Sequence, residues 1–204
     1  ESGAGKSLTG AAIIGLLDPP GRIAAGEIRF DGRRIDNLPY EAMRKVRGRQ
    51  IGAIFQDPLT SLNPLYTIGR QLTETIQAHL PIGNADARAR AIRLLEETGI
   101  QAAGERIDQY PHQFSGGMRQ RVVIALALAA QPKLIIADEP TTALDVSIQA
   151  QIIQVLKGLC RDHDTAVMLV THDMGVIAET ADRVAVMYAG RIVEVGPVAD
   201  VIHR

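Results

Sequence analysis

The sequence predicts an α/β domain built around a parallel β-sheet. Its clearest element is residues 134–137, a continuous apolar run that ends in the adjacent carboxylates of Asp138 and Glu139. Such a run is typical of a strand that is buried on both faces, as in a parallel sheet covered by helices. Similar runs occupy residues 51–55 and 165–170, and segments with helical periodicity separate the three. Strands that alternate with helices favour the α/β class.

Size and composition fit one domain with room for a subdomain. The chain has 204 residues, of which 46% are hydrophobic, and its 22 basic and 23 acidic residues nearly balance. This balance argues against a broad nucleic-acid-binding surface. The single cysteine, Cys160, excludes an internal disulfide and a multi-cysteine metal site within the chain, and it fits a reducing compartment. The longest apolar run, residues 122–130, is too short to span a bilayer.

The two acidic residues after the central strand lie where open α/β sheets place their ligand crevice. Asp138 could hold Mg²⁺ there, directly or through water. Glu139 could take a proton from a water molecule that attacks a phosphate. A solvated acidic turn explains the pair equally well when it is considered alone, so the other motifs decide the matter.

The start of the chain matches the end of a phosphate-binding loop. Residues 1–7 (Glu-Ser-Gly-Ala-Gly-Lys-Ser) fit G-x-x-x-x-G-K-[ST] without its first glycine. In that motif the lysine (Lys6) neutralises the β- and γ-phosphates and the hydroxyl (Ser7) binds Mg²⁺. Residues 8–17 supply the helix whose N-terminus must face the anion. A flexible glycine-rich terminus is the competing interpretation, and because the sequence begins inside the motif we expect a fragment of a longer protein.

Polar side chains also follow the other two buried strands. Gln56 follows residues 51–55, and its amide could ligate Mg²⁺ and sense an attacking water, or it could cap a turn. His172 follows residues 165–170 and could hydrogen-bond a γ-phosphate, although a lone histidine is more often structural. The ends of parallel strands meet at one edge of a sheet. We therefore expect both residues beside the same crevice as the acidic pair.

Between these strands, residues 68–130 have helical periodicity and contain no strand rich in Val and Ile, which indicates a helical insertion. Within it, residues 85–98 form a helix with Asn84 as its predicted N-cap and Gly99 as its stop. Gln56 and the insertion are joined by residues 59–64, which we expect to form a loop.

A second anion-binding site is predicted near the end of the insertion. Ser115, Gly116 and Gly117 precede an apolar helix over residues 122–130. A hydroxyl, bare backbone N–H groups and the positive end of a helix dipole together attract an anion. An ordinary serine N-cap followed by loose glycines is the alternative.

Two hairpins and a long helix complete the expected elements. The hairpins cover residues 26–35, turning at Asp31-Gly32, and residues 182–196, turning at Ala189-Gly190. Asp145 is expected to cap a helix over residues 146–159.

In this order the motifs resemble those of ATP-binding-cassette ATPases across essentially the whole chain. The corresponding segments are residues 2–7 (Walker A), Gln56 (Q-loop), residues 114–118 (signature), residues 134–139 (Walker B), residues 142–145 (D-loop) and His172 (switch histidine). The resemblance implies a P-loop NTPase (RecA-like) core with a small antiparallel β subdomain, in residues 1–56 and 131–204, and a helical subdomain in residues 57–130.

Residues 56–64 (QDPLTSLNP) and 138–151 resemble a narrower group, the cytoplasmic ATPases of bacterial dipeptide, oligopeptide and nickel importers. Phe114 and Met118 stand where Leu and Gln are commoner in the signature, as they do in importers of this group, and Thr142 stands where serine usually opens the D-loop. The first P-loop glycine and the upstream aromatic residue that stacks on adenine in the family are absent from this sequence.

The resemblance implies ATP and Mg²⁺ as cofactors. The nucleotide-binding residues would be Ser2, Gly3, Ala4, Gly5, Lys6 and Ser7 of one chain with Ser115, Gly116, Gly117 and Asp145 of a partner chain. Ser7, Gln56 and Asp138 would hold Mg²⁺. The catalytic residues would be Glu139, which polarises the attacking water, His172, which orients the γ-phosphate, and Gln56.

The implied partners are a second ATPase subunit, identical or paralogous, and integral-membrane permease subunits. The permease would dock at a groove between the Gln56 loop and the helical subdomain. An extracytoplasmic substrate-binding protein would take part indirectly, and no nucleic acid is expected. The protein would then lie peripherally on the cytoplasmic face of the bacterial inner membrane.

Three other classes compete with this interpretation. A DNA-repair or chromosome ATPase would need a long coiled coil between Gln56 and Ser115, where no sustained heptads occur. A ribosome-associated tandem protein would need a second cassette. A non-catalytic binding module is disfavoured by the presence of both Glu139 and His172.

Overall fold

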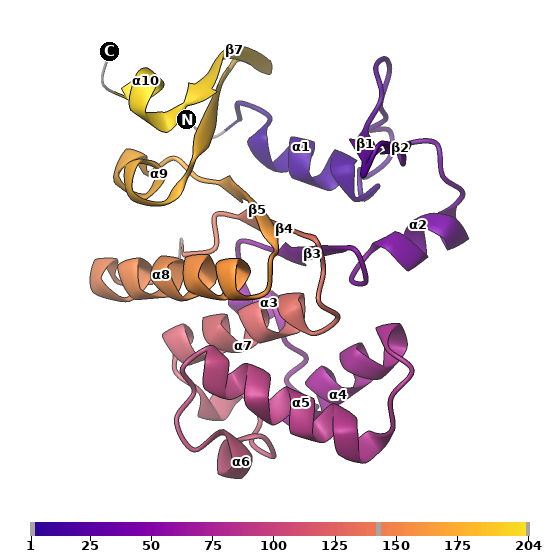
Figure 1. Cartoon of the computed structure of the whole chain (residues 1–204), viewed down its shortest axis with the longest axis vertical. Coiled ribbons are helices and arrows are strands. Elements are labelled where there is room, and N and C mark those ends of the chain that lie inside the picture. Colours follow the sequence, from indigo (N-terminus) through magenta and orange to yellow (C-terminus); the bar gives the residue numbers. More distant parts are fainter. Residues whose placement is uncertain (1–2, 142–143, 203–204) are drawn as a thin grey trace. The chain divides into compact units, whose positions relative to one another are not determined.

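The computed structural model describes residues 3–141 and 144–202. The chain divides into two compact units (Figure 1). The first unit comprises Glu1–Arg47 and Leu169–Arg204, and the second comprises Gly48–Met168. The boundaries expected from the sequence, residues 1–56 and 131–204 for the core and 57–130 for the helical subdomain, stay a prediction.

Short elements make up the first unit. They are α1 (Lys6–Ile13), β1 (Arg29–Phe30), β2 (Arg33–Arg34), α2 (Tyr40–Val46), α9 (Met174–Thr180), β6 (Arg183–Tyr188), β7 (Arg191–Pro197) and α10 (Val198–Ile202). Strands β6 and β7 pair antiparallel, and their connection at Ala189 and Gly190 has positive φ angles at both residues, as a tight hairpin turn requires. This hairpin confirms the turn predicted from the sequence.

The second unit contains the parallel strands and most of the helices. Its elements are β3 (Ile51–Ile54), α3 (Pro58–Ser61), α4 (Ile68–His79), α5 (Asn84–Glu97), α6 (Ala103–Arg106), the 3₁₀ helix η1 (Pro111–Gln113), α7 (Gly116–Leu128), β4 (Leu134–Asp138) and α8 (Val146–Asp162). Strand β5 (Ala166–Val170) begins in this unit. The expected loop at residues 59–64 therefore starts as a short helix.

A parallel sheet in the order β3-β4-β5 confirms the fold class predicted from the apolar runs. Strands β3 and β4 pair in parallel from Ile51 opposite Leu134 to Ile54 opposite Ala137. Ile51, Ile54 and Ile135 have at most 1% of their surface exposed. Burial on both faces explains why these strands lack the alternation of apolar and polar residues seen in half-exposed strands.

Helix α7 is the buried helix on which the second unit is packed. It contacts β3, α4, α5 and α8, and its residues Val122, Ile124 and Ala125 have no exposed surface. A helix that is apolar all round must be covered on all sides. At Gly52 of β3, an added Cβ would lie 2.6 Å from the carbonyl oxygen of Ala127, so the glycine allows the strand and the helix to approach closely.

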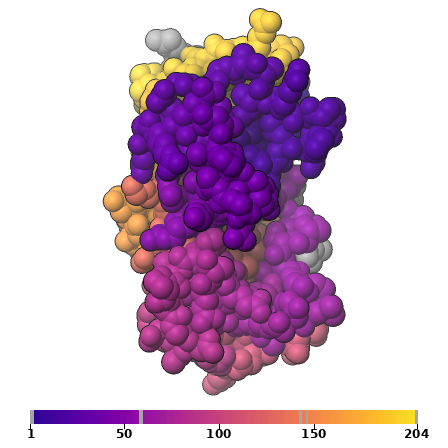
Figure 2. Space-filling model, turned by 90° about the vertical axis from the view of Figure 1, so that its right-hand side faces the viewer, coloured from indigo at the N-terminus to yellow at the C-terminus, as the bar shows by residue number. Residues whose placement is uncertain are grey.

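Two arginines cap each other's helices where α5 and α7 pack together. Arg90 of α5 donates from Nε to the carbonyl of Ala129 at the end of α7 (2.9 Å). Arg121 of α7 donates to the carbonyl of Thr98 at the end of α5 (2.6 Å). Each guanidinium satisfies a carbonyl that has no partner within its own helix. In Figure 2 the magenta surface of this unit belongs to the helical part that these contacts hold together.

Some helix ends differ from the sequence-based expectation. Helix α1 ends at Ile13, before the expected residue 17, because Gly15 adopts a left-handed conformation (φ 64°) just after it. The N-cap of α5 is Gly83, so the prediction of Asn84 as the cap is wrong by one residue. Gly99 follows the C-cap Thr98 with φ 82° and confirms the predicted stop. No helix of the described residues has the length and apolarity needed to cross a membrane.

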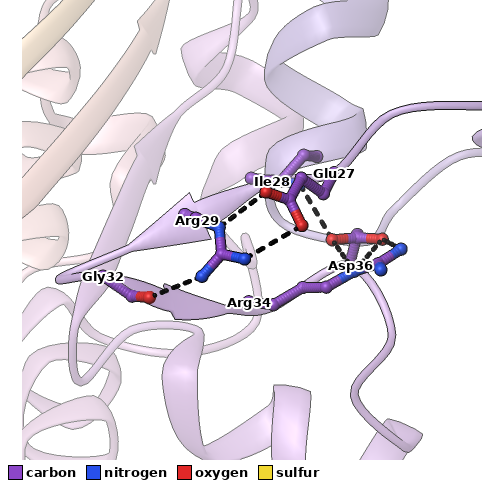
Figure 3. A network of polar contacts seen from close by, with 6 residues as sticks. All are labelled: Glu27, Ile28, Arg29, Gly32, Arg34 and Asp36. Carbon is purple, nitrogen blue, oxygen red and sulfur yellow. Dashed lines mark hydrogen bonds and ion pairs between the residues drawn. The ribbon is translucent and has the colours of Figure 1, made fainter.

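The β1–β2 hairpin is held by a small network of ion pairs and hydrogen bonds (Figure 3). The Arg29 guanidinium joins Glu27 (2.6 Å) to the carbonyl of Gly32 in the turn (3.0 Å). Asp36 accepts hydrogen bonds from Arg34 (2.8 Å) and from the backbone N–H of Ile28 (2.8 Å). A strand pair this short gains little from packing, so these polar contacts fix its register.

The Asp36 network predicts a pH effect on this hairpin. Hydrogen bonds from Arg34 and from Ile28 N–H favour the charged carboxylate and lower the pKa of Asp36 to about 2. A depressed carboxyl pKa stabilises the fold above the ordinary value of 3.8, and this stabilisation is lost as the pH falls through about 2. NMR titration should give a midpoint near 2 for Asp36, and Arg34→Gln should raise it. An unchanged midpoint in Arg34→Gln would contradict the assigned cause.

Candidate functional site

The phosphate-binding loop lies at the start of α1 in the first unit. Gly3 and Gly5 have φ angles of 93° and 92°, a left-handed conformation that glycine adopts without strain. Helix α1 begins at Lys6, directly after this turn, so its first N–H groups face the loop. Lys6 is half-buried and Ser7 is exposed at the same helix end. Ser2 lies outside the described residues.

The hairpin β6–β7 packs against this loop and the start of α1. Gly190 N–H in the hairpin turn donates to the carbonyl of Ala4 (3.2 Å). The Met187 sulfur accepts a hydrogen bond from the Thr9 hydroxyl (3.9 Å), and its methyl group would meet a Cβ on Gly5 at 3.5 Å. These contacts hold the loop although it comes from a different part of the chain.

His172 lies in the same unit, in the connection between β5 and α9, and its side chain is exposed. The neighbouring Asp173 caps α9 by accepting from the N–H groups of Gly175 (2.8 Å) and Val176 (3.2 Å). Asp173 N–H in turn donates to the Thr171 hydroxyl (3.0 Å). His172 is therefore carried on a connection that is fixed on both sides.

In the second unit, parallel pairing brings Gln56 and Glu139 together. Ile54 of β3 lies opposite Ala137 of β4, so the residues that follow both strands reach the same edge of the sheet. There the Gln56 side chain donates from Nε2 to Oε2 of Glu139 at 3.2 Å. Gln56 therefore lies beside the acidic pair, as expected, and Asp138, the last residue of β4, directly precedes Glu139. The expected position of His172 beside the same crevice stays a prediction.

The backbone at Glu139 is in an unusual conformation. Its φ angle is 45°, in the left-handed region that residues other than glycine rarely adopt. Such strain is maintained only when the surrounding structure enforces it, and it concentrates at functional sites. Buried Pro140 follows immediately and restricts the conformation of Glu139 further. The backbone therefore turns sharply at Glu139, whose carboxylate is proposed to accept a proton from the attacking water.

The signature segment is the N-terminus of α7, also in the second unit. Ser115 is its N-cap and accepts from the N–H of Met118 (3.3 Å), as the alternative interpretation of this segment expects. The anion-binding role of the segment stays a prediction. Helix α7 begins at Gly116, earlier than the expected residue 122. Ser115 and Gly116 are exposed, so the hydroxyl and the first N–H groups of the helix are accessible to an anion.

Packing against α8 supplies a structural reason for Gly117. A Cβ on Gly117 would lie 2.9 Å from Cγ2 of Ile148, closer than real side chains approach. A Cβ on Gly116 would lie 3.4 Å from Cδ2 of Leu144. Gly117 is therefore not loose, because it allows the start of α8 to pack directly on the signature segment. At Gly116 the distance is an ordinary contact and does not require glycine.

Asp145 is the N-cap residue of α8, in line with its predicted position. Its side chain makes no capping hydrogen bond, so the expected capping contact is wrong. The carboxylate is exposed just beyond Leu144. The remaining D-loop positions, 142 and 143, lie outside the described residues.

The site contains contacts that the sequence did not indicate. Ile148 of α8 packs against Gly117 of α7. Gln149, also of α8, donates hydrogen bonds to the carbonyls of Thr141 and Leu144, which follow Glu139 in the chain. The only available signal was the pair of adjacent glycines before an apolar helix, which could have indicated a close approach.

The chain belongs to the ABC transporter family, whose family model matches residues 1–142. OppD, an oligopeptide transport ATP-binding protein of Bacillus subtilis, is 55% identical over all of this chain and 57% of its own length. DppD, a dipeptide transport ATP-binding protein of the same organism, is 50% identical over all of this chain and 61% of its own length. The chain thus spans about three fifths of these relatives, and the resemblance to the peptide-importer group is confirmed.

Solved cassettes share the fold. The dimeric ATP-binding cassette MJ0796 bound to ADP and Pi is 30% identical, with a TM-score of 0.83 over 97% of this chain and 82% of that chain. CbiO1 from Clostridium perfringens is 28% identical, with a TM-score of 0.85 over 100% of this chain and 76% of that chain. The P-loop NTPase fold expected from the motifs is therefore confirmed.

The donor chemistry of the predicted metal ligands fits Mg²⁺. Ser7, Gln56 and Asp138 offer only oxygen atoms, and Mg²⁺ prefers oxygen and keeps several water molecules. It usually takes one or two protein ligands together with substrate phosphates. The described residues contain no group of three or more His, Cys, Asp or Glu side chains placed to hold a metal.

The close approach of Ile148 to Gly117 predicts that a side chain at position 117 destabilises the second unit. In Gly117→Ala the new methyl would push Ile148 away, which should destabilise the second unit by about 1–3 kcal/mol and separate α7 from α8. Denaturant unfolding of the full-length protein would measure this loss.

The matched rescue is Gly117→Ala combined with Ile148→Ala, which removes the clashing Cγ2. The double variant should be less destabilised than the sum of the two single variants. If the loss of stability in the double variant equals the sum of the two single losses, the clash between the residue 117 methyl and Ile148 is not the cause of the destabilisation.

Proposed function

We propose that this chain is the ATP-hydrolysing part of a subunit that powers a bacterial peptide importer, with nickel import as the alternative cargo within the same group. The observation that carries the proposal is the hydrogen bond between Gln56 and Glu139 at the ends of neighbouring parallel strands. It joins Glu139, the residue proposed to accept a proton from the attacking water, to Gln56, whose amide can also contact that water. The peptide-transport names and the 50–55% identity of the relatives support the cargo class.

In the proposed site, two chains would bind ATP between them. The phosphate-binding loop of one chain, residues 2–7, would face Ser115, Gly116, Gly117 and Asp145 of the other. The loop N–H groups and Lys6 neutralise phosphate charge, and the exposed N-terminus of α7 supplies the second set of N–H donors. ATP would drive closure because it gains contacts in the closed pair that the open pair lacks.

Each remaining residue has a defined task in hydrolysis. Glu139 accepts a hydrogen bond from the attacking water and draws its proton away. Gln56 holds the Glu139 carboxylate and orients it, and His172 donates to the γ-phosphate. Ser7, Gln56 and Asp138 would hold Mg²⁺ together with the phosphates, and the ion would neutralise charge at the transferring phosphoryl group.

A pocket in the second unit is a suitable docking place for the permease. It has a volume of about 450 Å³ and is lined by Gly48, Gly52, Ala53, Phe55, Thr60, Ser61, Val123, Leu126 and Ala127. The lining is largely apolar, and Phe55 directly precedes Gln56 in the chain. We propose that a short amphipathic helix of the permease occupies it. A helix that contacts Phe55 can shift the neighbouring Gln56, so a movement of the permease would change the position of a proposed catalytic residue. The subunit would then lie on the cytoplasmic face of the bacterial inner membrane.

The catalytic assignment is tested with Glu139→Gln in the full-length protein. The substitution keeps the size of the side chain and removes its ability to accept a proton. We expect ATP binding to be retained and turnover to fall by at least about a hundredfold. Steady-state turnover and equilibrium binding of ATP would be measured side by side, and rapid hydrolysis by the variant would overturn the role of Glu139.

The docking assignment is tested by filling the pocket. Thr60→Trp places a large ring at the pocket lining, and Gln101→Trp places the same ring at an exposed position outside it. Turnover would be measured with and without the purified permease in detergent. Thr60→Trp should weaken permease binding, and with it stimulation, by roughly tenfold, which corresponds to about 1.4 kcal/mol.

Basal turnover without the permease should stay within about twofold in Gln101→Trp, since Gln101 lies outside the pocket. Stimulation is therefore expressed for each variant relative to its own basal turnover. Equal stimulation of Thr60→Trp and Gln101→Trp would place the docking site elsewhere. Stimulation of the unsubstituted protein by DNA or ribosomes in place of the permease would contradict the importer function itself.

A further inference from the structure

Gln149 of α8 holds the turn that follows Glu139. Its side-chain nitrogen Nε2 donates to the carbonyl of Thr141 (3.0 Å) and to the carbonyl of Leu144 (2.9 Å). Both hydrogens of one amide group are thereby used on the same turn. The Thr141 carbonyl also accepts the N–H of Leu144 (3.1 Å), so a backbone hydrogen bond joins the same two residues that Gln149 contacts.

This turn connects the two functional segments of the second unit. On its N-terminal side, Pro140 joins it to Glu139, which Gln56 contacts. On its C-terminal side, the Leu144 side chain packs over Gly116 at the start of α7. A shift of the turn would therefore move the Glu139 carboxylate, the signature helix, or both.

We propose that Gln149 is a positioning residue for hydrolysis, which couples Glu139 to the signature segment of the same chain. The inference rests on the proposed function and assigns a role to a residue outside the motifs. An amide suits this role because it is a neutral group with two donors on one atom. A carboxylate of the same size would only accept hydrogen bonds and would repel both carbonyls, and a thioether would offer no donor.

Loss of the amide would loosen the turn without removing any group that touches nucleotide. The Leu144 carbonyl loses the donor that Gln149 supplies, and a partly buried carbonyl without a partner favours rearrangement. Displacements of about 1 Å near a reacting centre can lower rates by up to a hundredfold. The phosphate-binding loop lies in the first unit and is untouched by this loss, so we expect the larger effect on turnover and the smaller one on nucleotide affinity.

A purely structural alternative is that Gln149 only stabilises the start of α8. The residue lies close to the N-terminus of that helix, where side chains often bond preceding carbonyls. In that case substitution would lower the amount of folded protein, while each folded site would work normally. Turnover per nucleotide-binding site separates the two roles.

The experiment compares Gln149→Met, Gln149→Lys and Gln154→Met in the full-length protein with its permease. Methionine matches glutamine in length and lacks donors, whereas lysine restores donors. Gln154 is exposed on the same helix and provides the matched control. Sites are titrated with a non-hydrolysable ATP analogue, and turnover is expressed per titrated site.

We expect Gln149→Met to lower turnover per site about tenfold, with analogue affinity within about twofold. Gln149→Lys should recover at least about threefold of that loss, and Gln154→Met should match the unsubstituted protein. If Gln149→Met does not fold, the isosteric Gln149→Glu carries the same expectation.

Normal turnover per site in Gln149→Met, or a lysine variant no better than the methionine variant, would overturn the positioning role. Absence of turnover in the unsubstituted protein would instead overturn the proposed function. The two failures are therefore distinguishable.

Discussion

Parallel pairing of β3 with β4 is the constraint on which the rest of the site depends. Because Ile54 lies opposite Ala137, both strands end at one edge, and the side chains that follow them meet there. The Gln56–Glu139 hydrogen bond of 3.2 Å is the direct result. Two short apolar runs, far apart in the sequence, thus place an amide beside a carboxylate without any dedicated binding loop.

The buried helix α7 connects that arrangement to the signature segment, the proposed second anion-binding site. Its N-terminus presents Ser115 and Gly116 to solvent, and its body packs against β3 and α8. Glycine at 117 lets Ile148 approach closely, and Leu144 lies against Gly116. The carboxylate and the signature segment consequently belong to one packed unit, so the proposed closure on a partner chain would be transmitted to Glu139 through packed contacts.

Much of this could be predicted from the sequence, and the limits have a physical origin. The strands, the hairpin turn at Ala189-Gly190 and the Ser115 cap follow from local patterns of apolarity, turn residues and capping. The cap of α5 at Gly83, the missing side-chain cap from Asp145 and the role of Gln149 did not follow. Each depends on which side chain a neighbouring segment brings within reach, and local propensity does not contain that information.

Intermolecular cross-linking of the full-length protein tests the central claim, that two chains meet across ATP, most directly. Leu8→Cys marks the P-loop helix of one chain and Ser115→Cys marks the signature of another, both in a Glu139→Gln background. The native Cys160 is buried, which raises the pKa of its thiol to about 11 and keeps it unreactive at neutral pH. When the two singly substituted chains are mixed with a short bifunctional thiol reagent, the account predicts a product that joins two chains with ATP and none without it. The same yield with and without ATP, or no product under either condition, would contradict the account.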